Sequence, residues 1–302
     1  MTRIARRCLM LAVATTLAAL LSGCDDGKVG VELSADPAAT TANRQIGVSI
    51  EAITLQRDDG SEDRIKLDDP VTVDLLLYNG RTFTLLDAES LDAGDYTGIR
   101  LEYRNPQNDD GKDNYVIDGN GARQALIVDA DDAFTPLDLT VKKKGKTYTL
   151  QLRIDLRLSY SENSNTDERH LAPVMRAVRD TKAAKVSGSV KDSLISGSDC
   201  KDGRNTGVGV TVYAFNKLAE GTEPHDYDGS EPRAIATTPI TGSSGNWRYN
   251  LPLLPPGDYT LALTCNGDIE DPTELQSDEI EFLSDTHDVE LGEGDDDDKD
   301  FN

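Results

Sequence analysis

Three acidic turns in the chain carry enough carboxylates to bind a hard cation. The candidate ligands are Asp58, Asp59 and Asp63 in the first turn, Asp109 and Asp110 in the second, and Asp226 and Asp228 in the third. Calcium takes about six to eight oxygen ligands, which flexible Asp-rich loops can supply. None of the turns has EF-hand spacing, because either the first ligand or the glutamate at the last position is missing. The alternative is a set of solvated turns, since Asp and Gly are ordinary turn residues. We expect no other cofactor, and calcium is the ion that these turns favour.

The first 24 residues have the features of a bacterial export signal. Three arginines precede an apolar run over residues 8–21, and this run falls short of the roughly 20 residues that span a bilayer. The run ends in Leu21-Ser22-Gly23-Cys24, which resembles the lipobox of bacterial lipoproteins. The resemblance implies a signal peptide over residues 1–23, an acylated Cys24 and a short tether over residues 24–27. An ordinary cleaved signal with a chance cysteine is the alternative.

The expected location is the bacterial cell envelope, with the protein lipid-anchored and facing the periplasm. Asp25 and Asp26 resemble the signal that retains enteric lipoproteins, which favours the inner membrane over the outer. The chain has 55 acidic and 31 basic residues, a net charge of −24, so its surface repels phosphate backbones and nucleic acid is not an expected partner. The partners expected are the membrane, through the lipid, and an envelope protein or polysaccharide that the sequence does not identify.

Two cysteines remain for the folded part of the chain once Cys8 and Cys24 are assigned to the export segment. They are Cys200 and Cys265, and an oxidising envelope compartment favours a disulfide between them. Metal binding is the competing use, but neither belongs to a Cys-x-x-Cys pair and no histidine is close in sequence. We predict the disulfide.

The sequence holds no complete catalytic motif. Its histidines, His170, His225 and His287, are far apart, and a lone histidine is usually a surface or core residue. Residues 145–147 end like a phosphate-binding loop but lack the glycine five positions earlier, and residues 242–245 are one short of a nucleophile elbow. We therefore predict a protein that is not an enzyme. A secreted hydrolase that uses scattered carboxylates remains an alternative, because carboxylates are abundant.

The elements that would position these residues are β-strands. Apolar and polar residues alternate from Tyr148 to Leu158, which predicts one long strand with a single apolar face. Within residues 46–55 the phase changes at Ala52-Ile53, which predicts a bulge. The pattern predicts an all-β protein of two β-sandwich-like domains in tandem, over residues 28–180 and 181–292, after the lipoprotein signal peptide. The acidic end, residues 293–302, is predicted to be a disordered tail.

Two features of the strand pattern concern aromatic residues. Both domains contain a Gly-Asp-Tyr-Thr turn, at residues 94–97 and 257–260, in which Gly permits the turn and Tyr begins the next apolar face. Trp247 could be a carbohydrate platform, but it alternates with Tyr249 and Leu251 on one strand face. One core face explains all three residues, so core is the favoured interpretation.

These segments resemble two known families. The first domain resembles the domain-of-unknown-function family numbered 4382, found in bacterial lipoproteins. The segments that carry this resemblance are Asp36-Pro37, residues 46–55, 73–76 and 94–101, and the long final strand. The second domain resembles the carboxypeptidase-regulatory and Cna-B type of prealbumin-like sandwich, in residues 186–190, 245–249 and 256–260. The first family implies no activity, and domains of the second type usually act as spacers or binding modules. We therefore expect a non-catalytic binding or structural role, with a carbohydrate- or calcium-binding accessory module as the alternative. Residues 217–233 and 266–278 are the expected contact loops.

Overall fold

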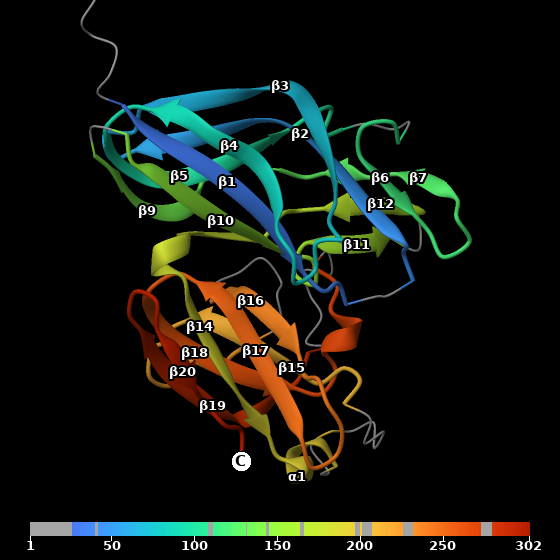
Figure 1. The fold of residues 1–302 in the computed structure, drawn as a ribbon. Helices are drawn as coiled ribbons and strands as arrows, with labels where there is room; N and C mark the ends of the chain where they lie inside the picture. Colours follow the sequence, from blue (N-terminus) through green and yellow to red (C-terminus); the bar gives the residue numbers. More distant parts are fainter. Residues whose placement is uncertain are drawn as a thin grey trace, which may run out of the picture.

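The structure is a computed structural model that describes residues 26–39, 42–107, 111–130, 132–142, 145–163, 166–196, 200, 207–225, 232–272 and 280–302. These residues are almost entirely β and form two domains (Figure 1). The first strand begins at the end of the molecule remote from the second domain, and the C-terminus lies at the opposite end (Figure 1). Among the described residues no helix is long and apolar enough to cross a membrane.

The first domain encloses its core between two main sheets. One has the order β13-β10-β1-β4, with β1 (Gly27–Asp36), β4 (Phe83–Leu91), β10 (Thr147–Asp155) and β13 (Met175–Arg179). The other has the order β7-β6-β2-β5-β9, with β3 also on β2; its strands are β2 (Gln45–Arg57), β3 (Glu62–Asp74), β5 (Gly94–Tyr103), β6 (Tyr115–Ile117), β7 (Arg123–Ala125) and β9 (Thr135–Val141). A small third sheet joins β8 (Ile127–Val128), β11 (Tyr160–Asn163) and β12 (Glu168–Leu171). One apolar cluster runs through the domain, from Val31 on β1 to Ile53 on β2.

The long strand predicted over residues 148–158 stops at Asp155, three residues early. The Asp155 carboxylate accepts the backbone N–H groups of Arg157 and Leu158, at 3.1 and 3.3 Å. A side chain that bonds its own following backbone offers the chain a turn in place of a ladder, so the strand ends there. The predicted bulge is present, because the register of β2 with both neighbours shifts between Ile50 and Ala52.

The second domain is a smaller pair of sheets. A short 3-10 turn, η1 (Asp180–Lys182), leads into β14 (Ala184–Val190), followed by α1 (Asp192–Ile195), β15 (Thr211–Asn216), β16 (Ala234–Pro239), β17 (Trp247–Leu254), β18 (Gly257–Thr264), η2 (Gly267–Ile269), β19 (Phe282–Leu291) and β20 (Asp296–Asp298). The sheet orders are β17-β14-β20 and β16-β15-β18-β19. Trp247, Tyr249 and Leu251 are buried in the core between these sheets, so Trp247 is not a surface platform.

The prediction of a disordered acidic tail was wrong. Residues 296–298 form β20, which pairs in parallel with Lys185–Ser187 of β14, and the side chain of Phe301 is buried in the domain core. The backbone N–H groups of Lys299 and Phe301 donate to β14 carbonyls at 2.8 and 2.9 Å. The physical reason is that β14 has an open edge on this side and one aromatic residue fits the core. The run of aspartates, which suggested disorder, stays in solvent.

The Gly-Asp-Tyr turn shared by the two domains has the same hydrogen bond in both. The hydroxyl of Tyr96 donates to the carbonyl of Asp92 at 2.9 Å, and that of Tyr259 donates to the carbonyl of Pro255 at 2.5 Å. In each case a buried tyrosine bonds to the backbone four residues upstream, as in the tyrosine corner of many β-sandwiches.

Candidate functional site

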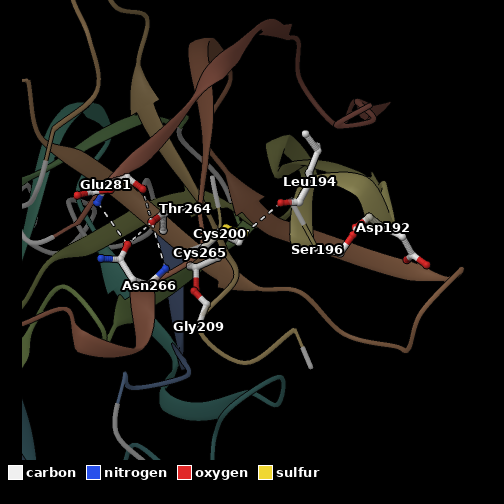
Figure 2. Close-up of a disulfide and its surroundings, with 10 residues drawn as sticks. Asp192, Leu194, Ser196, Cys200, Gly209, Thr264, Cys265, Asn266 and Glu281 are labelled. Atoms are coloured by element: carbon white, nitrogen blue, oxygen red, sulfur yellow. Dashed lines mark hydrogen bonds between the residues drawn. A yellow bond between two sulfur atoms is a disulfide. The ribbon is translucent and has the colours of Figure 1, made fainter. Parts of the chain in front are cut away.

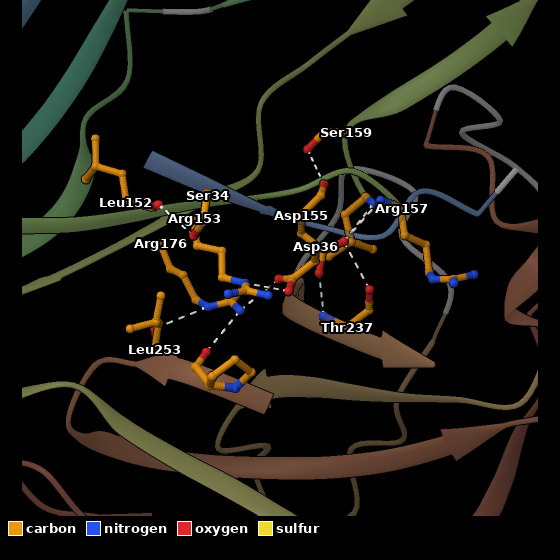
Figure 3. Close-up of polar contacts among 12 residues, drawn as sticks. Ser34, Asp36, Leu152, Arg153, Asp155, Arg157, Ser159, Arg176, Thr237 and Leu253 are labelled. Atoms are coloured by element: carbon orange, nitrogen blue, oxygen red, sulfur yellow. Dashed lines mark hydrogen bonds and ion pairs between the residues drawn. The ribbon is translucent and has the colours of Figure 1, made fainter. Parts of the chain in front are cut away.

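Buried charges gather where the first domain meets the second (Figure 3). Arg153 on β10 and Arg176 on β13 are directly opposite each other in an antiparallel pair, and like charges in such a position repel. Asp36, at the end of β1, lies between them, with its carboxylate oxygens 2.5 Å from Arg153 Nε and 2.8 Å from Arg176 Nη2. All three side chains are buried, so the parallel pairing of β1 with β10 supplies the counter-charge that the two arginines need.

Arg176 also reaches into the second domain. Its guanidinium donates to the carbonyls of Pro252 and Leu253 on β17, at 3.1 and 3.2 Å. Leu253 has a φ of 57°, a left-handed conformation that costs a non-glycine residue about 1 kcal/mol or more. Arg176 thus binds the carbonyl oxygens of this strained residue and of the residue before it. It therefore links the ion pair with Asp36 to β17 of the second domain.

Asp155 makes the second polar contact across the interface (Figure 3). Its carboxylate accepts the backbone N–H of Thr237 on β16 and the Thr237 hydroxyl, the latter at 3.0 Å. The carboxylate has no exposed surface. Burial, and next the nearby Asp36 carboxylate, raise the pKa of Asp155 to about 6, against the lowering effect of Arg176 and of the Thr237 hydrogen bond.

The charges at the interface balance. Arg157 donates to the carbonyl of Gly267 in the second domain, and the hydroxyl of Tyr213 donates to Glu270 at 2.7 Å. Among the described residues, the buried groups here are three carboxylates and three guanidinium groups: Asp36, Asp155 and Glu270 with Arg153, Arg157 and Arg176. Removing one partner of such a set leaves a buried charge uncompensated, at about 3–5 kcal/mol.

An apolar contact and a surface ion pair complete the interface. Leu158 and Val174 of the first domain pack against Tyr213, Phe215 and Ala262, on the face of the four-stranded sheet that is turned away from its own core. On the surface, Lys182 Nζ lies 2.7 Å from Asp138 of the first domain and 2.7 Å from Glu293 of the second. The arrangement fixes the orientation of the two domains.

The predicted calcium turns are only partly described by the structure. Asp109, Asp110, Asp226 and Asp228 lie outside the described residues. In the first turn, Asp59 accepts the Ser61 backbone N–H and hydroxyl at 2.9 and 2.6 Å, and Asp63 binds Arg57 and the Tyr96 hydroxyl, each at 2.5 Å. These two carboxylates therefore already have protein partners. In the part of the chain that the structure describes, no three His, Cys, Asp or Glu side chains are grouped to hold a metal.

The predicted disulfide is present (Figure 2). Cys200 and Cys265 have Cα atoms 5.3 Å apart and a sequence separation of 65. Cys265 follows β18 directly, where Thr264 donates its hydroxyl to the Glu281 carbonyl at 2.7 Å. The bond thus ties the segment after α1 to the end of a central strand. Cys24, the predicted lipidation site, lies outside the described residues.

The interface network was not predicted from the sequence. Alternation over residues 148–158 places Arg153, Asp155 and Arg157 on the polar face of the predicted strand. A signal was available in the sequence, because these three residues bring both charge signs to alternate positions at the end of one strand. The histidines form no cluster where they are described: His170 Nδ1 lies 2.7 Å from Asp129, while His287 packs on Phe301.

Comparison with known proteins bears on the first domain. Residues 26–173 match the family model described as Domain of unknown function (DUF4382). This match confirms the resemblance of the first domain, and the Cna-B resemblance of the second domain stays a prediction. No curated protein matches the chain.

Similar solved structures are distant. They include the TIE protein of Bacillus anthracis (12% identity, TM-score 0.22, 91% of this chain and 34% of that one) and a leucine-rich repeat protein of Bacteroides thetaiotaomicron (12%, 0.22, 91% and 26%). The major pilin subunit BcpA of Bacillus cereus is 11% identical, with a TM-score of 0.19 and coverage of 92% and 99%. The chain thus spans only about a third and a quarter of the first two proteins. At such TM-scores these likenesses support no statement about function.

Proposed function

We propose that this protein is a lipid-anchored component of the bacterial cell envelope that holds its second domain away from the membrane for a non-catalytic binding or structural role. The observation that carries the proposal is the position at which β1 begins. The strand β1 begins at Gly27, three residues after Cys24, and it begins at the end of the molecule remote from the second domain (Figure 1).

The geometry constrains where each domain would lie on such an anchor. Three residues of extended chain reach about 10 Å, so a lipid on Cys24 keeps the first domain at the membrane surface. The interface then sets the direction of the second domain, because Arg176 and Asp155 bind residues of the second domain and Lys182 binds Asp138 of the first. A flexible pair of domains would not keep a fixed distance from the membrane, and these contacts oppose such flexibility.

A non-catalytic role agrees with the distribution of polar groups. Three buried charged side chains, Asp36, Asp155 and Arg176, are engaged with one another and with backbone groups of the second domain. Groups bound in this way serve the contact between domains. The rival, a hydrolase with scattered carboxylates, requires a carboxylate pair facing a substrate cleft.

Fatty-acid labelling tests the anchor. We expect the full chain, expressed in a bacterium, to incorporate labelled palmitate and to fractionate with membranes, and Cys24→Ala to lose the label. Cys8→Ala is the matched control, because it changes the other cysteine of the export segment. Label on Cys24→Ala, or no label on the native chain, contradicts the proposal. Asp25→Ser, followed by separation of the two membranes, tests the proposed inner-membrane location.

A further inference from the structure

A cavity of about 360 Å³ lies at the junction of the two domains. The first domain contributes Leu101 and Tyr103 at the end of β5 and Phe134 before β9, and the second contributes Asn216 and Arg233. The cavity exists because β9 pairs with β5 only as far as Ile99, so the last residues of β5 have no neighbouring strand on that side. Clefts between domains are frequent ligand sites.

Tyr103, which lines this cavity, carries a polar group that the fold does not use. Tyr103 is 8% exposed, and its hydroxyl has no hydrogen-bond partner among the described residues. A buried hydroxyl without a partner costs about 1–3 kcal/mol, so it calls for a water or a ligand oxygen. Burial alone raises the pKa of this phenol, which therefore stays a hydrogen-bond donor at neutral pH.

The polar groups around the cavity include both charge signs. Arg100 is held in place, because it donates to the Asp132 carbonyl at 3.0 Å and its guanidinium lies 4.6 Å from the centre of the Phe134 ring. On the same wall, Asp129 is oriented by His170 at 2.7 Å. The exposed Arg233 and the amide of Asn216 complete a set that can both donate and accept hydrogen bonds.

We infer that this cavity binds a neutral oligosaccharide, which gives a ligand class to the binding role proposed above. The charged side chains on its walls already have partners, since Arg100 lies 3.6 Å from Glu62 and Asp129 binds His170. They therefore favour neither an anion nor a cation, which leaves a neutral polar ligand. A sugar carries hydroxyls that donate and accept, together with a C–H face that packs on an aromatic ring such as Phe134. The volume falls within the range of small-molecule sites, about 300–1,000 Å³.

Glycan binding by the full chain in lipid nanodiscs tests this inference. The probe is a printed array of neutral and acidic oligosaccharides, followed by titration calorimetry with the neutral oligosaccharide bound best. We expect Tyr103→Phe to weaken binding about fivefold, the effect of one hydrogen bond. Ala172→Trp, at an exposed alanine that lines the cavity, should abolish binding by filling the entrance. Arg248→Gln is the matched control, since Arg248 lines a different cavity in the second domain.

The outcomes separate this inference from the membrane anchor. Binding of neutral glycans that Ala172→Trp abolishes and Arg248→Gln leaves unchanged supports the site. Binding of acidic glycans only, no binding, or binding that Ala172→Trp leaves intact overturns it. Palmitate labelling of the same preparation reports on the anchor independently: a labelled protein that binds no neutral glycan refutes the site and leaves the anchor standing. Unchanged thermal melting of each variant excludes misfolding as the cause.

Discussion

The two domains differ in how their cores are closed. In the first, two main sheets surround a single apolar cluster. In the second, sheets of three and four strands are supplemented by a disulfide, by Phe301 after β20 and by the packing of Leu158 from the first domain. The second domain therefore depends on contacts outside its own sheets.

This difference follows from size. A smaller domain buries a smaller fraction of its surface and has less apolar burial to set against chain entropy. The second domain also places aromatic residues, Tyr213 and Phe215, on the sheet face opposite its core, where Leu158 of the first domain and Phe282 of the second pack against them. We expect substitutions at the disulfide, at Phe301 and at the interface to destabilise the second domain more than the first. Hydrogen exchange measured separately for each domain can show this.

The largest effect should come from the disulfide. A closed loop with a sequence separation of 65 stabilises by about 4 kcal/mol in the chain-entropy model. We expect Cys200→Ala with Cys265→Ala to lower the free energy of unfolding of the second domain by about that amount, measured by urea denaturation followed by hydrogen exchange. Protection of β2 and β5 in the first domain is the internal control. Equal loss of protection in both domains would show that the core of the first domain also depends on the disulfide.

Phe301 comes next. It is 1% exposed and its ring meets Tyr249 and His287, with centroids 5.8 and 4.7 Å away. Removing a buried aromatic costs about 3–5 kcal/mol, and we expect about 3 for Phe301→Ala because the residues on either side of it are exposed. Gly188→Ala should release the same segment, since a Cβ there would collide with the Lys299 carbonyl. Faster exchange of the Lys299 and Phe301 amides is the measurement.

A matched change in the first domain sharpens this result. Phe83 is a half-buried aromatic that packs on Tyr78 with ring centroids 5.2 Å apart. Phe83→Ala should destabilise the first domain by less than Phe301→Ala destabilises the second. An effect of Phe301→Ala below about 1 kcal/mol would contradict the role assigned to the chain end.

The interface should give a smaller effect that depends on pH. The pKa of Asp155 is raised to about 6 from 3.8, so between these pH values the folded protein holds a proton that the unfolded chain has lost. Stability from this group is therefore greatest at low pH and falls as pH rises to about 6. We expect the stability of the native chain relative to Asp155→Asn to fall by about 2 kcal/mol from pH 4 to pH 7, measured by urea denaturation. A constant difference across this range would mean that Asp155 titrates normally.

Local pattern predicted most of the fold, and distant contacts account for what it missed. Alternation located the strands and the bulge in β2, because it depends only on neighbouring residues in the sequence. Cysteine counting identified the pair Cys200 and Cys265, because only two cysteines remain for the folded part. The end of β10 was missed because the Asp155 carboxylate bonds Arg157 and Leu158 in place of solvent. The ordered tail was missed because nothing in residues 293–302 reveals that β14 leaves an edge open to them.

The interface could not be predicted for a related reason. The partner of Arg176 is a pair of carbonyl groups, at Pro252 and Leu253, and a backbone carbonyl has no identity in a sequence. Tyr103 ends the alternating run of residues 99–103, a pattern that also fits an ordinary core residue. The early end of the pairing between β5 and β9 leaves this tyrosine at the wall of a cavity.

The smallest effects should come from the two tyrosine corners, which compare one motif in two surroundings. Tyr259 bonds only to a carbonyl, and burial raises its pKa to about 12. Tyr96 has a second bond, to the Asp63 carboxylate, which Arg57 also binds. Hydrogen bonds to charged groups contribute about 1.5–3 kcal/mol and neutral ones about 1. We therefore expect Tyr96→Phe to destabilise the first domain by about 2 kcal/mol and Tyr259→Phe to destabilise the second by about 1.

Adding Asp63→Asn should make the two tyrosine substitutions nearly equal, because it removes the charge that distinguishes them. If Tyr96→Phe still lowers the free energy of unfolding more than Tyr259→Phe in the Asp63→Asn background, the difference between the two corners lies in packing. The Asp63 carboxylate then does not stabilise the Tyr96 corner.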